Sequence, residues 1–221
     1  ANGRPLIDYV LENLSTVFKP EDIIIIVKYR KEMIIDYYAG RGYTFVDQVE
    51  MLGTGHALLV TEQVLCDYRG PVLTAFCDMP MILSSTVEDL LACHKKEGAC
   101  ASVLTADVVP TPAYGRILRD AQGAYVDVVE ERDCTEDQKK ISEVHVGMDV
   151  FEQDGLLYDR LRKNKPSESN GEIYLTRLPT VCIQEGKKVS LYKIDDLEQI
   201  WGVNDPYDLA RMEKTLQSRG R

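Results

Sequence analysis

PVLTAFCDMP, residues 71–80, is the most informative segment of the chain, because an apolar run of strand length ends in a turn that carries a lone aspartate. Apolar residues then recur at helical spacing over 87–96, and a second buried-strand pattern follows over 101–106. Strand, helix and strand in this order predict a βαβ unit with two parallel strands. We therefore expect an α/β protein.

The same alternation extends upstream. The predicted elements are a helix over 5–18, a strand over 22–27, a helix over 31–39, a strand over 43–49 and, after Gly53-Thr54-Gly55, a helix over 56–66. This order is typical of a Rossmann-like, mostly parallel sheet with helices on both faces. In such sheets, ligands bind at the carboxyl ends of the strands.

The downstream half has a different pattern. The predicted elements are a hairpin over 114–130 around the turn at 120–123, a strand over 144–151, a helix over 155–163, a polar surface loop over 164–171 and a helix over 206–217. We interpret residues 1–221 as one domain with a β-rich insertion.

Composition narrows the class of function. Of the 221 residues, 44% are hydrophobic and 28% charged, which is typical of a soluble globular protein. The net charge of -10 argues against a protein that coats nucleic acid, because that role needs clustered Lys and Arg. No apolar run reaches the roughly 18 residues of a membrane helix. The six cysteines form no CxxC pair, so we expect small buried side chains in a reducing cytoplasm, and no zinc site.

Three segments of the chain could carry chemistry. Gly53 lets backbone approach a flat or anionic ligand at a helix start, although the same pattern serves as a plain strand-to-helix turn. Asp78 follows a strand, where a carboxylate suits Mg²⁺ or caps a helix. Near the C-terminus, Asn204 and Asp205 could ligate a metal or cap the helix that follows.

Seven segments occur in a characteristic order: QVEMLGTGHA (48–57), FCDMP (76–80), YGRILRD (114–120), VVEERD (128–133), EVHVG (143–147), GEIYLT (171–176) and GVND (202–205). This series resembles the nucleotide-sugar pyrophosphorylase family, and within it the uridylyltransferase domain of bacterial N-acetylglucosamine-1-phosphate uridylyltransferases. The similarity extends from near residue 3 to the C-terminus. It implies the nucleotide-diphospho-sugar transferase fold, with a sugar-binding part over about 112–180.

The resemblance implies a role for each matched residue. The nucleotide and its base would be contacted by Gln48, Gly53 and Thr54. A catalytic Mg²⁺ would be held by Asp78 and Asn204. The sugar site would be lined by Gly115, Glu130, His145, Tyr174 and Thr176.

The chain departs from the family pattern at several of these places. His145 stands where the pattern has Asn, Val146 where it has Thr, and Arg177 where it has Asp. Phe76 and Cys77 replace a Tyr and a Gly beside the metal-binding aspartate. The resemblance therefore leaves open whether the sugar is N-acetylglucosamine or a related one.

The start of the chain also matters for the expected activity. Members of the family begin with a strand that leads into a Gly-rich loop with a basic residue, which binds the triphosphate. The chain opens at Ala1-Asn-Gly-Arg-Pro5, which aligns after that loop. We expect about 20 further residues upstream, and a chain without them would be a poor catalyst.

The implied reaction joins a nucleoside triphosphate to a sugar-1-phosphate and releases pyrophosphate. The resemblance favours UTP as the nucleoside triphosphate. Catalysis would rest on positioning and on charge neutralisation by Mg²⁺, without a nucleophilic side chain. Two alternatives remain: a cytidylyl- or guanylyltransferase acting on another phosphate substrate, and a nucleotide-sugar-binding protein with impaired catalysis. The expected partners are the two small substrates, with no nucleic acid and no membrane, and self-association is left open.

Overall fold

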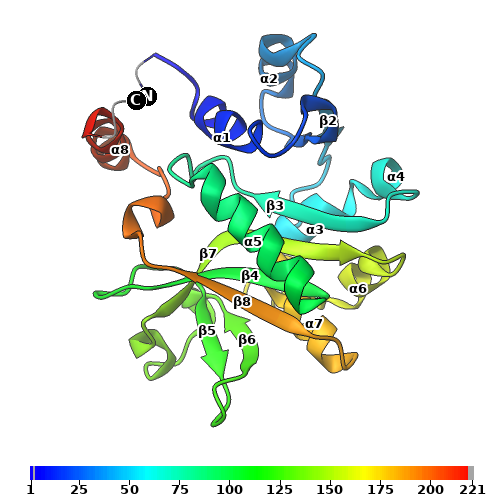
Figure 1. Ribbon diagram of the computed structural model, residues 1–221, viewed down its shortest axis with the longest axis vertical. Coiled ribbons are helices and arrows are strands. Elements are labelled where there is room, and N and C mark those ends of the chain that lie inside the picture. Colours follow the sequence, from blue (N-terminus) through cyan, green and yellow to red (C-terminus); the bar gives the residue numbers. More distant parts are fainter. Residues whose placement is uncertain (2, 219–221) are drawn as a thin grey trace.

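A computed structural model describes residue 1 and residues 3–218 of the chain. Two sheets form the framework (Figure 1). The smaller one pairs β1 (Ile24–Val27) with β2 (Thr44–Asp47) in parallel. The larger one has six strands, namely β3 (Gly70–Ala75), β4 (Ala101–Asp107), β5 (Arg116–Arg119), β6 (Tyr125–Val129), β7 (Glu143–Gln153) and β8 (Val189–Ile194).

The long strand β7 organises the larger sheet. One of its edges pairs antiparallel with β4, and the other pairs antiparallel with β3 and, near the start of β7, with β5. β4 pairs in parallel with β8 on its far side. The expected α/β class is confirmed, and β7 makes the sheet a mixed one because it runs against its neighbours.

Helices cover both faces of the larger sheet. The helices are α1 (Leu6–Leu14), α2 (Lys31–Tyr38), α3 (Thr54–Leu59), α4 (Glu62–Leu65), α5 (Ser84–Glu97), α6 (Leu157–Lys163), α7 (Leu178–Gln184) and α8 (Pro206–Ser218). In Figure 1, α5 crosses one face of the sheet, and α6 and α7 lie behind it. One core joins α5 to the sheet through Leu90 and Leu104, and a second joins α6 and α7 to it through Leu161, Leu178 and Phe151.

Two predicted helices are shorter than expected. The helix predicted over 5–18 ends at Leu14, because the N–H groups of Val17 and Phe18 both donate to the Leu14 carbonyl and close a turn. The helix predicted over 56–66 begins at Thr54 and is interrupted after Leu59. The buried Thr61 hydroxyl donates to the Leu58 carbonyl there, and it also lies 2.9 Å from the hydroxyl of Tyr158.

The loop over 164–171 is less exposed than predicted. Asn164 and Ser167 are buried. The Asn164 amide donates to the Tyr174 carbonyl at 2.6 Å, and the Ser167 N–H donates to the Glu172 carbonyl at 2.8 Å. The loop therefore folds back against the segment that follows it, and these bonds explain why polar residues lie inside.

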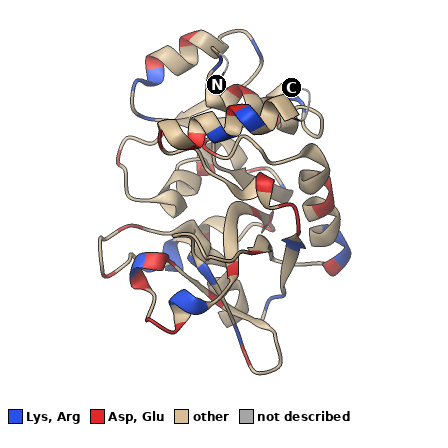
Figure 2. Cartoon of the chain, turned by 90° about the vertical axis from the view of Figure 1, so that its left-hand side faces the viewer, with Lys and Arg blue, Asp and Glu red and all other residues tan. Residues whose placement is uncertain are grey.

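Other sequence-based expectations can be compared with the described residues. Within that part of the chain, no helix is long and apolar enough to cross a membrane. Acidic and basic residues are interspersed over the helices (Figure 2). Of the six cysteines, Cys100 and Cys182 are buried, whereas Cys66 and Cys77 are exposed, so the expectation of buried cysteines was wrong for these last two.

Candidate active site

Asp78 lies in the turn that follows β3. Its Oδ1 atom is buried and accepts no hydrogen bond from the part of the chain that the structure describes. Burial raises the pKa of the Asp78 carboxyl, and a backbone hydrogen bond opposes that effect only in part. A buried carboxylate oxygen without a donor is costly unless a ligand or cation meets it. The turn therefore holds a group that is poised for a ligand.

A second turn, near the C-terminus, meets the Asp78 turn. The Val203 N–H donates to the Asp78 carbonyl at 2.8 Å. A Cβ atom built on Gly202 would lie 3.3 Å from Asn204 Nδ2 and 3.7 Å from the Asp78 carbonyl oxygen. The Tyr114 hydroxyl secures this turn by accepting from the Gly202 N–H at 3.2 Å. The structure thus brings the two predicted metal ligands to adjacent turns.

The oxygen donors of Asp78 and Asn204 fit a hard cation such as Mg²⁺. Such an ion commonly takes one or two protein oxygens and completes its shell with water and substrate phosphates. No cluster of three or more His, Cys, Asp and Glu side chains suited to a metal occurs among residue 1 and residues 3–218.

The neighbouring Asp205 has a structural role. Its Oδ1 accepts the N–H of Asp208 at 2.8 Å, which is the hydrogen bond of an N-cap at the start of α8. The sequence left metal binding and capping open for both Asn204 and Asp205. In the structure the capping contact belongs to Asp205, and the Asn204 side chain makes no such bond among the described contacts.

The predicted nucleotide-binding residues share one loop between β2 and α3. The Gln48 amide nitrogen donates to the Gly53 carbonyl at 3.0 Å and lies 3.2 Å from His56 Nδ1. Thr54 Oγ1 accepts the N–H of Leu175 at 2.9 Å. The loop is therefore tied both to itself and to the segment that carries the predicted sugar-binding residues.

The conformation of this loop requires a glycine at position 53. Its φ is +100°, and a Cβ atom there would lie 2.6 Å from the Ile173 carbonyl oxygen. The same carbonyl accepts the N–H of Gly55 at 2.7 Å, and the Ile173 N–H donates to the Leu52 carbonyl at 2.8 Å. Close backbone approach fixes the loop, so the direction of the Gly53 carbonyl is fixed as well.

The predicted sugar-binding residues are linked by contacts. The His145 N–H donates to the Gly115 carbonyl at 2.8 Å, and the Thr176 hydroxyl donates to Glu130 Oε1 at 2.7 Å. The charge of Glu130 also acts on the buried ring of His145. Tyr174 has a buried hydroxyl that finds no partner among the described residues.

Two guanidinium groups flank the Tyr174 ring. The Cζ atoms of Arg132 and Arg177 lie 5.8 Å and 5.9 Å from its centroid. Arg177 also lies 3.8 Å from an oxygen of Asp133. The replacement of an acidic residue by Arg177 therefore places a cation against one of the predicted sugar-binding residues.

His145 is engaged at both ring nitrogens. Nε2 lies 2.9 Å from Asp149 Oδ1, and Nδ1 accepts the N–H of Gly147 at 3.2 Å. Burial lowers the pKa of His145, but the negative charge and hydrogen bond of Asp149 outweigh it, so the net shift is upward. The ring spans a bulge in β7, where the pairing with β4 changes register between Val103 and Thr105.

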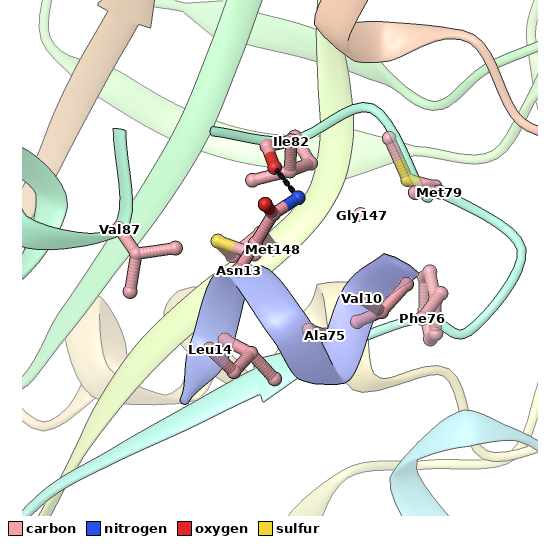
Figure 3. Close-up of a pocket in the computed structure, with 10 residues that line it drawn as sticks. All are labelled: Val10, Asn13, Leu14, Ala75, Phe76, Met79, Ile82, Val87, Gly147 and Met148. Atoms are coloured by element: carbon pink, nitrogen blue, oxygen red, sulfur yellow. Dashed lines mark hydrogen bonds between the residues drawn. The ribbon is translucent and has the colours of Figure 1, made fainter. Parts of the chain in front are cut away.

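An apolar pocket supports the Asp78 turn (Figure 3). Val10 and Leu14 of α1 line one side of it, and Phe76 and Met79 line another. A Cβ atom on Gly147 would lie 2.8 Å from Met79 Sδ, so the β7 bulge packs tightly against the turn. The lining suits packing rather than phosphate binding, and it couples the bulge to the Asp78 loop.

Sequence reasoning missed three residues that hold the site together: His56, Tyr114 and Asp149. His56 and Tyr114 lie inside segments that carried the resemblance, but neither received a role. Asp149 interrupts the apolar run of β7 four residues after His145, and that charged pair in a buried strand was the available signal.

Comparisons with known proteins identify the family of the chain. Residues 1–143 match the family described as MobA-like NTP transferase domain. The chain is 36% identical over 217 residues to the "Bifunctional protein GlmU" of Lactobacillus delbrueckii subsp. bulgaricus, and 33% identical over 217 residues to that of Pelotomaculum thermopropionicum. Each alignment covers 98% of this chain but only 46% and 47% of the relative, so the chain spans about half the length of these proteins.

Solved structures show the same fold at low identity. A UDP-glucose pyrophosphorylase complexed with UDP-glucose superposes with a TM-score of 0.69 at 18% identity, covering 96% of this chain and 88% of that one. A nucleoside-diphosphate-sugar pyrophosphorylase from Vibrio cholerae RC9 gives 0.71 at 13% identity, covering 97% and 89%. The nucleotidyltransferase fold expected from the sequence is thereby confirmed.

Proposed function

The chain belongs to the family of MobA-like NTP transferase domains, and from this premise we propose that it is a sugar-1-phosphate nucleotidyltransferase. Its substrates are a nucleoside triphosphate and a sugar-1-phosphate. We propose UTP for the first and N-acetylglucosamine-1-phosphate or a related sugar phosphate for the second. The products are the nucleotide sugar and pyrophosphate. The relatives named GlmU and the pyrophosphorylases of the same fold support this choice.

One observation carries the proposal most strongly. Asp78 keeps a buried carboxylate oxygen that has no hydrogen-bond partner among residue 1 and residues 3–218, at the turn that meets the turn of Asn204. A structural aspartate would be expected to have its oxygens satisfied. An unmet oxygen at the carboxyl end of a strand indicates a ligand-binding role, and a Mg²⁺–phosphate ligand fits its charge and hardness.

The reaction requires little covalent chemistry from the protein. An oxygen of the sugar phosphate attacks the α-phosphorus, the new P–O bond forms, and the bond to the bridging oxygen of the β-phosphate breaks, so that pyrophosphate leaves with its electron pair. Bound Mg²⁺ would neutralise charge on the phosphate oxygens. Asp78 and Asn204 would hold that ion, while the loop of Gln48, Gly53 and Thr54 positions the nucleotide.

The sugar end of the site would be formed by Glu130, Tyr174 and Thr176, with Gly115 and His145 beneath them. In this arrangement Glu130, held by Thr176, accepts hydrogen bonds from sugar hydroxyls, and Tyr174 offers a hydroxyl that has no partner in the described part of the chain. A site of this kind discriminates by leaving its polar groups unpaired with the wrong substrate.

Replacement of His145 by Asn is predicted to shift preference toward N-acetylglucosamine-1-phosphate. The single change would leave the buried Asp149 carboxylate without its partner. The substrate profile should therefore be measured in the double variant His145→Asn/Asp149→Asn, with Asp149→Asn alone as the control. A profile identical to that of the control would refute a role of position 145 in sugar choice.

The proposed function is tested by pyrophosphate release. Purified protein that includes any residues preceding Ala1 is assayed with UTP, CTP and GTP against a panel of sugar-1-phosphates, with Mg²⁺ and with EDTA. Turnover with UTP and a hexosamine phosphate supports the proposal, and preference for CTP or GTP would redirect it to another nucleotidyltransferase. Binding of nucleotide sugar without any turnover would identify a binding protein instead.

A further inference from the structure

We infer that His56 is a positioning residue that turns the Gln48 amide so that only its carbonyl oxygen faces the nucleotide base. The ligand class that follows is a pyrimidine whose N3 carries a hydrogen, uracil or thymine, in preference to cytosine. The identity of the ligand rests on the proposed function. The arrangement of Gln48 and His56 is independent of it.

The Gly53 carbonyl decides which way the Gln48 amide lies. The side-chain atom 3.0 Å from that carbonyl oxygen must be a donor, since two oxygens at this distance would repel. Nε2 is therefore the atom that faces Gly53. The carbonyl itself cannot turn away, because Gly53 is held at positive φ against Ile173.

The second amide hydrogen is used by His56. Gln48 Nε2 lies 3.2 Å from His56 Nδ1, so Nδ1 must present a lone pair and the ring proton must be on Nε2. Both N–H groups of Gln48 are then engaged inside the protein. No described residue donates to its Oε1, which is also absent from the set of buried side-chain atoms without a partner. The free function of Gln48 is that of an acceptor.

An acceptor distinguishes uracil from cytosine at N3. Uracil and thymine carry a hydrogen on N3 and can donate to the Gln48 oxygen. Cytosine presents a lone pair at N3 and would place two acceptors face to face. Because a site of fixed polarity leaves its group unpaired with the wrong base, the fixed amide selects between the two pyrimidines. Without His56 only the Gly53 contact would hold the amide, so a rotation that presents its NH₂ group to cytosine would cost one hydrogen bond less.

The first test examines the ring without any ligand. Long-range ¹H–¹⁵N NMR spectra of the full chain, with His56 assigned by comparison with a His56→Asn variant, report the protonation of each ring nitrogen. We expect an unprotonated Nδ1 and a protonated Nε2 at neutral pH. A protonated Nδ1 would overturn the inference, whatever the protein does with nucleotides.

The second test measures base choice. Steady-state pyrophosphate release with UTP and with CTP gives the ratio of the two kcat/KM values. In His56→Leu, which lacks an acceptor, we expect this ratio to fall about tenfold, the factor that one oriented hydrogen bond is worth, mainly through a higher KM for UTP. In His56→Asn, whose Oδ1 can take the place of Nδ1, the ratio should stay within about twofold of the parent protein.

The outcomes separate this inference from the proposed function. If the parent protein turns over no triphosphate, the proposed function fails, and calorimetric titration with UDP and CDP then measures base choice directly. Preference for UDP that is lost in His56→Leu and kept in His56→Asn would still support the positioning role. An unchanged ratio in a folded His56→Leu protein, or binding of neither nucleotide, would overturn it.

Discussion

Two polar clusters of this molecule differ in whether their buried hydrogen-bonding atoms have partners. Between α5 and the larger sheet, Nδ1 of His94, a residue of α5, lies 2.8 Å from Ser102 Oγ, and its Nε2 lies 3.1 Å from Glu152 Oε2. Carboxylate, imidazole and hydroxyl follow one another as in a hydrolase triad. Yet Ser102 is 0% exposed, and its hydroxyl lies 2.6 Å from that of Ser190. The hydroxyl is inaccessible to a substrate and already has partners.

The candidate active site shows the opposite state. Four buried side-chain atoms lack a partner in the described part of the chain, and two of them belong to the predicted site residues Asp78 and Tyr174. The contrast predicts that unmet hydrogen-bonding capacity indicates a ligand site better than a familiar arrangement of side chains does. Satisfied clusters should affect stability, and unsatisfied ones should affect activity.

Replacement of Asp78 by Asn should give the largest effect. We expect turnover to fall by at least about 10³-fold, because the charge that would hold the metal and phosphates is lost. Stability should stay equal or rise, since burial raises the pKa of this carboxyl and its ionised form is disfavoured in the folded state. Pyrophosphate release and urea unfolding measure the two quantities.

The exposed Asp67 provides the control for that experiment. Asp67→Asn should change neither turnover nor stability. If Asp78→Asn instead unfolds the protein at lower urea and keeps its activity, Asp78 is structural and the contrast between the two clusters fails.

Replacement of Arg160 by Leu should give the largest loss of stability. This guanidinium is 1% exposed, donates to both oxygens of Asp154 at 2.8 Å, and donates to Glu185 at 2.8 Å. Breaking such a pairing costs about 3 kcal/mol. Arg162→Leu on the same helix is the control, because its ion pairs are exposed and should contribute less than about 0.5 kcal/mol.

The Arg160 pairing also predicts a dependence on pH. Hydrogen bonding to Arg160 is the main cause that lowers the pKa of Asp154. A folded-state pKa below the unfolded one means that the stabilisation is complete above the ordinary Asp range and disappears as the pH falls below it. Unfolding free energies between neutral pH and the acid limit should therefore converge for the parent and Arg160→Leu proteins. Parallel curves would contradict the assignment.

Replacement of His94 by Ala should have an intermediate effect on stability. The change removes two hydrogen bonds and leaves a cavity beneath α5, which together cost about 2 kcal/mol. Turnover should remain within about threefold of the parent, because this cluster would not contact the substrates and only the loss of stability would act on the site. Lys95→Ala, at an exposed position of the same helix, is the control for stability. A large loss of turnover in a folded His94→Ala protein would mean that the triad-like cluster takes part in the reaction.

The sequence predicts best where burial is complete and continuous. Strands β3 and β4 and helix α5 were predicted to within a few residues, and Val103 and Leu104 of β4 are 0% exposed. Helix α7 and strand β8 were not predicted. They have seven and six residues, and periodicity is a weak signal over such short segments.

The position of individual residues of the candidate site could be predicted from the sequence, but the contacts between them could not. The position of Asp78 after a strand is visible in the sequence. Its contact with the turn before Asn204 depends on how the chain returns to the same edge. The pairing of His145 with Asp149 depends on a bulge, because in a regular strand the two would be too far apart to bond. Register and bulges are tertiary outcomes, so no spacing rule predicts them.

The same contrast can be tested on two residues that are adjacent in the sequence, Asn204 and Asp205. Asp205 accepts the Asp208 N–H and caps α8, whereas Asn204 makes no capping bond through its side chain among the described contacts. Asp205→Ala should therefore lower the free energy of unfolding by about 1 kcal/mol, the usual value of an N-cap, and leave turnover nearly unchanged. Asn204→Ala should do the reverse, because it removes an amide oxygen from the turn that meets the Asp78 turn and leaves the α8 cap in place. Urea unfolding with constant m-values measures the free energy of unfolding of both variants, and pyrophosphate release measures their turnover. If Asp205→Ala loses turnover while Asn204→Ala loses only stability, the two roles are exchanged. In that case the metal-binding oxygen belongs to the Asp205 carboxylate, and the capping bond seen in the structure does not exclude a ligand role for the residue that makes it.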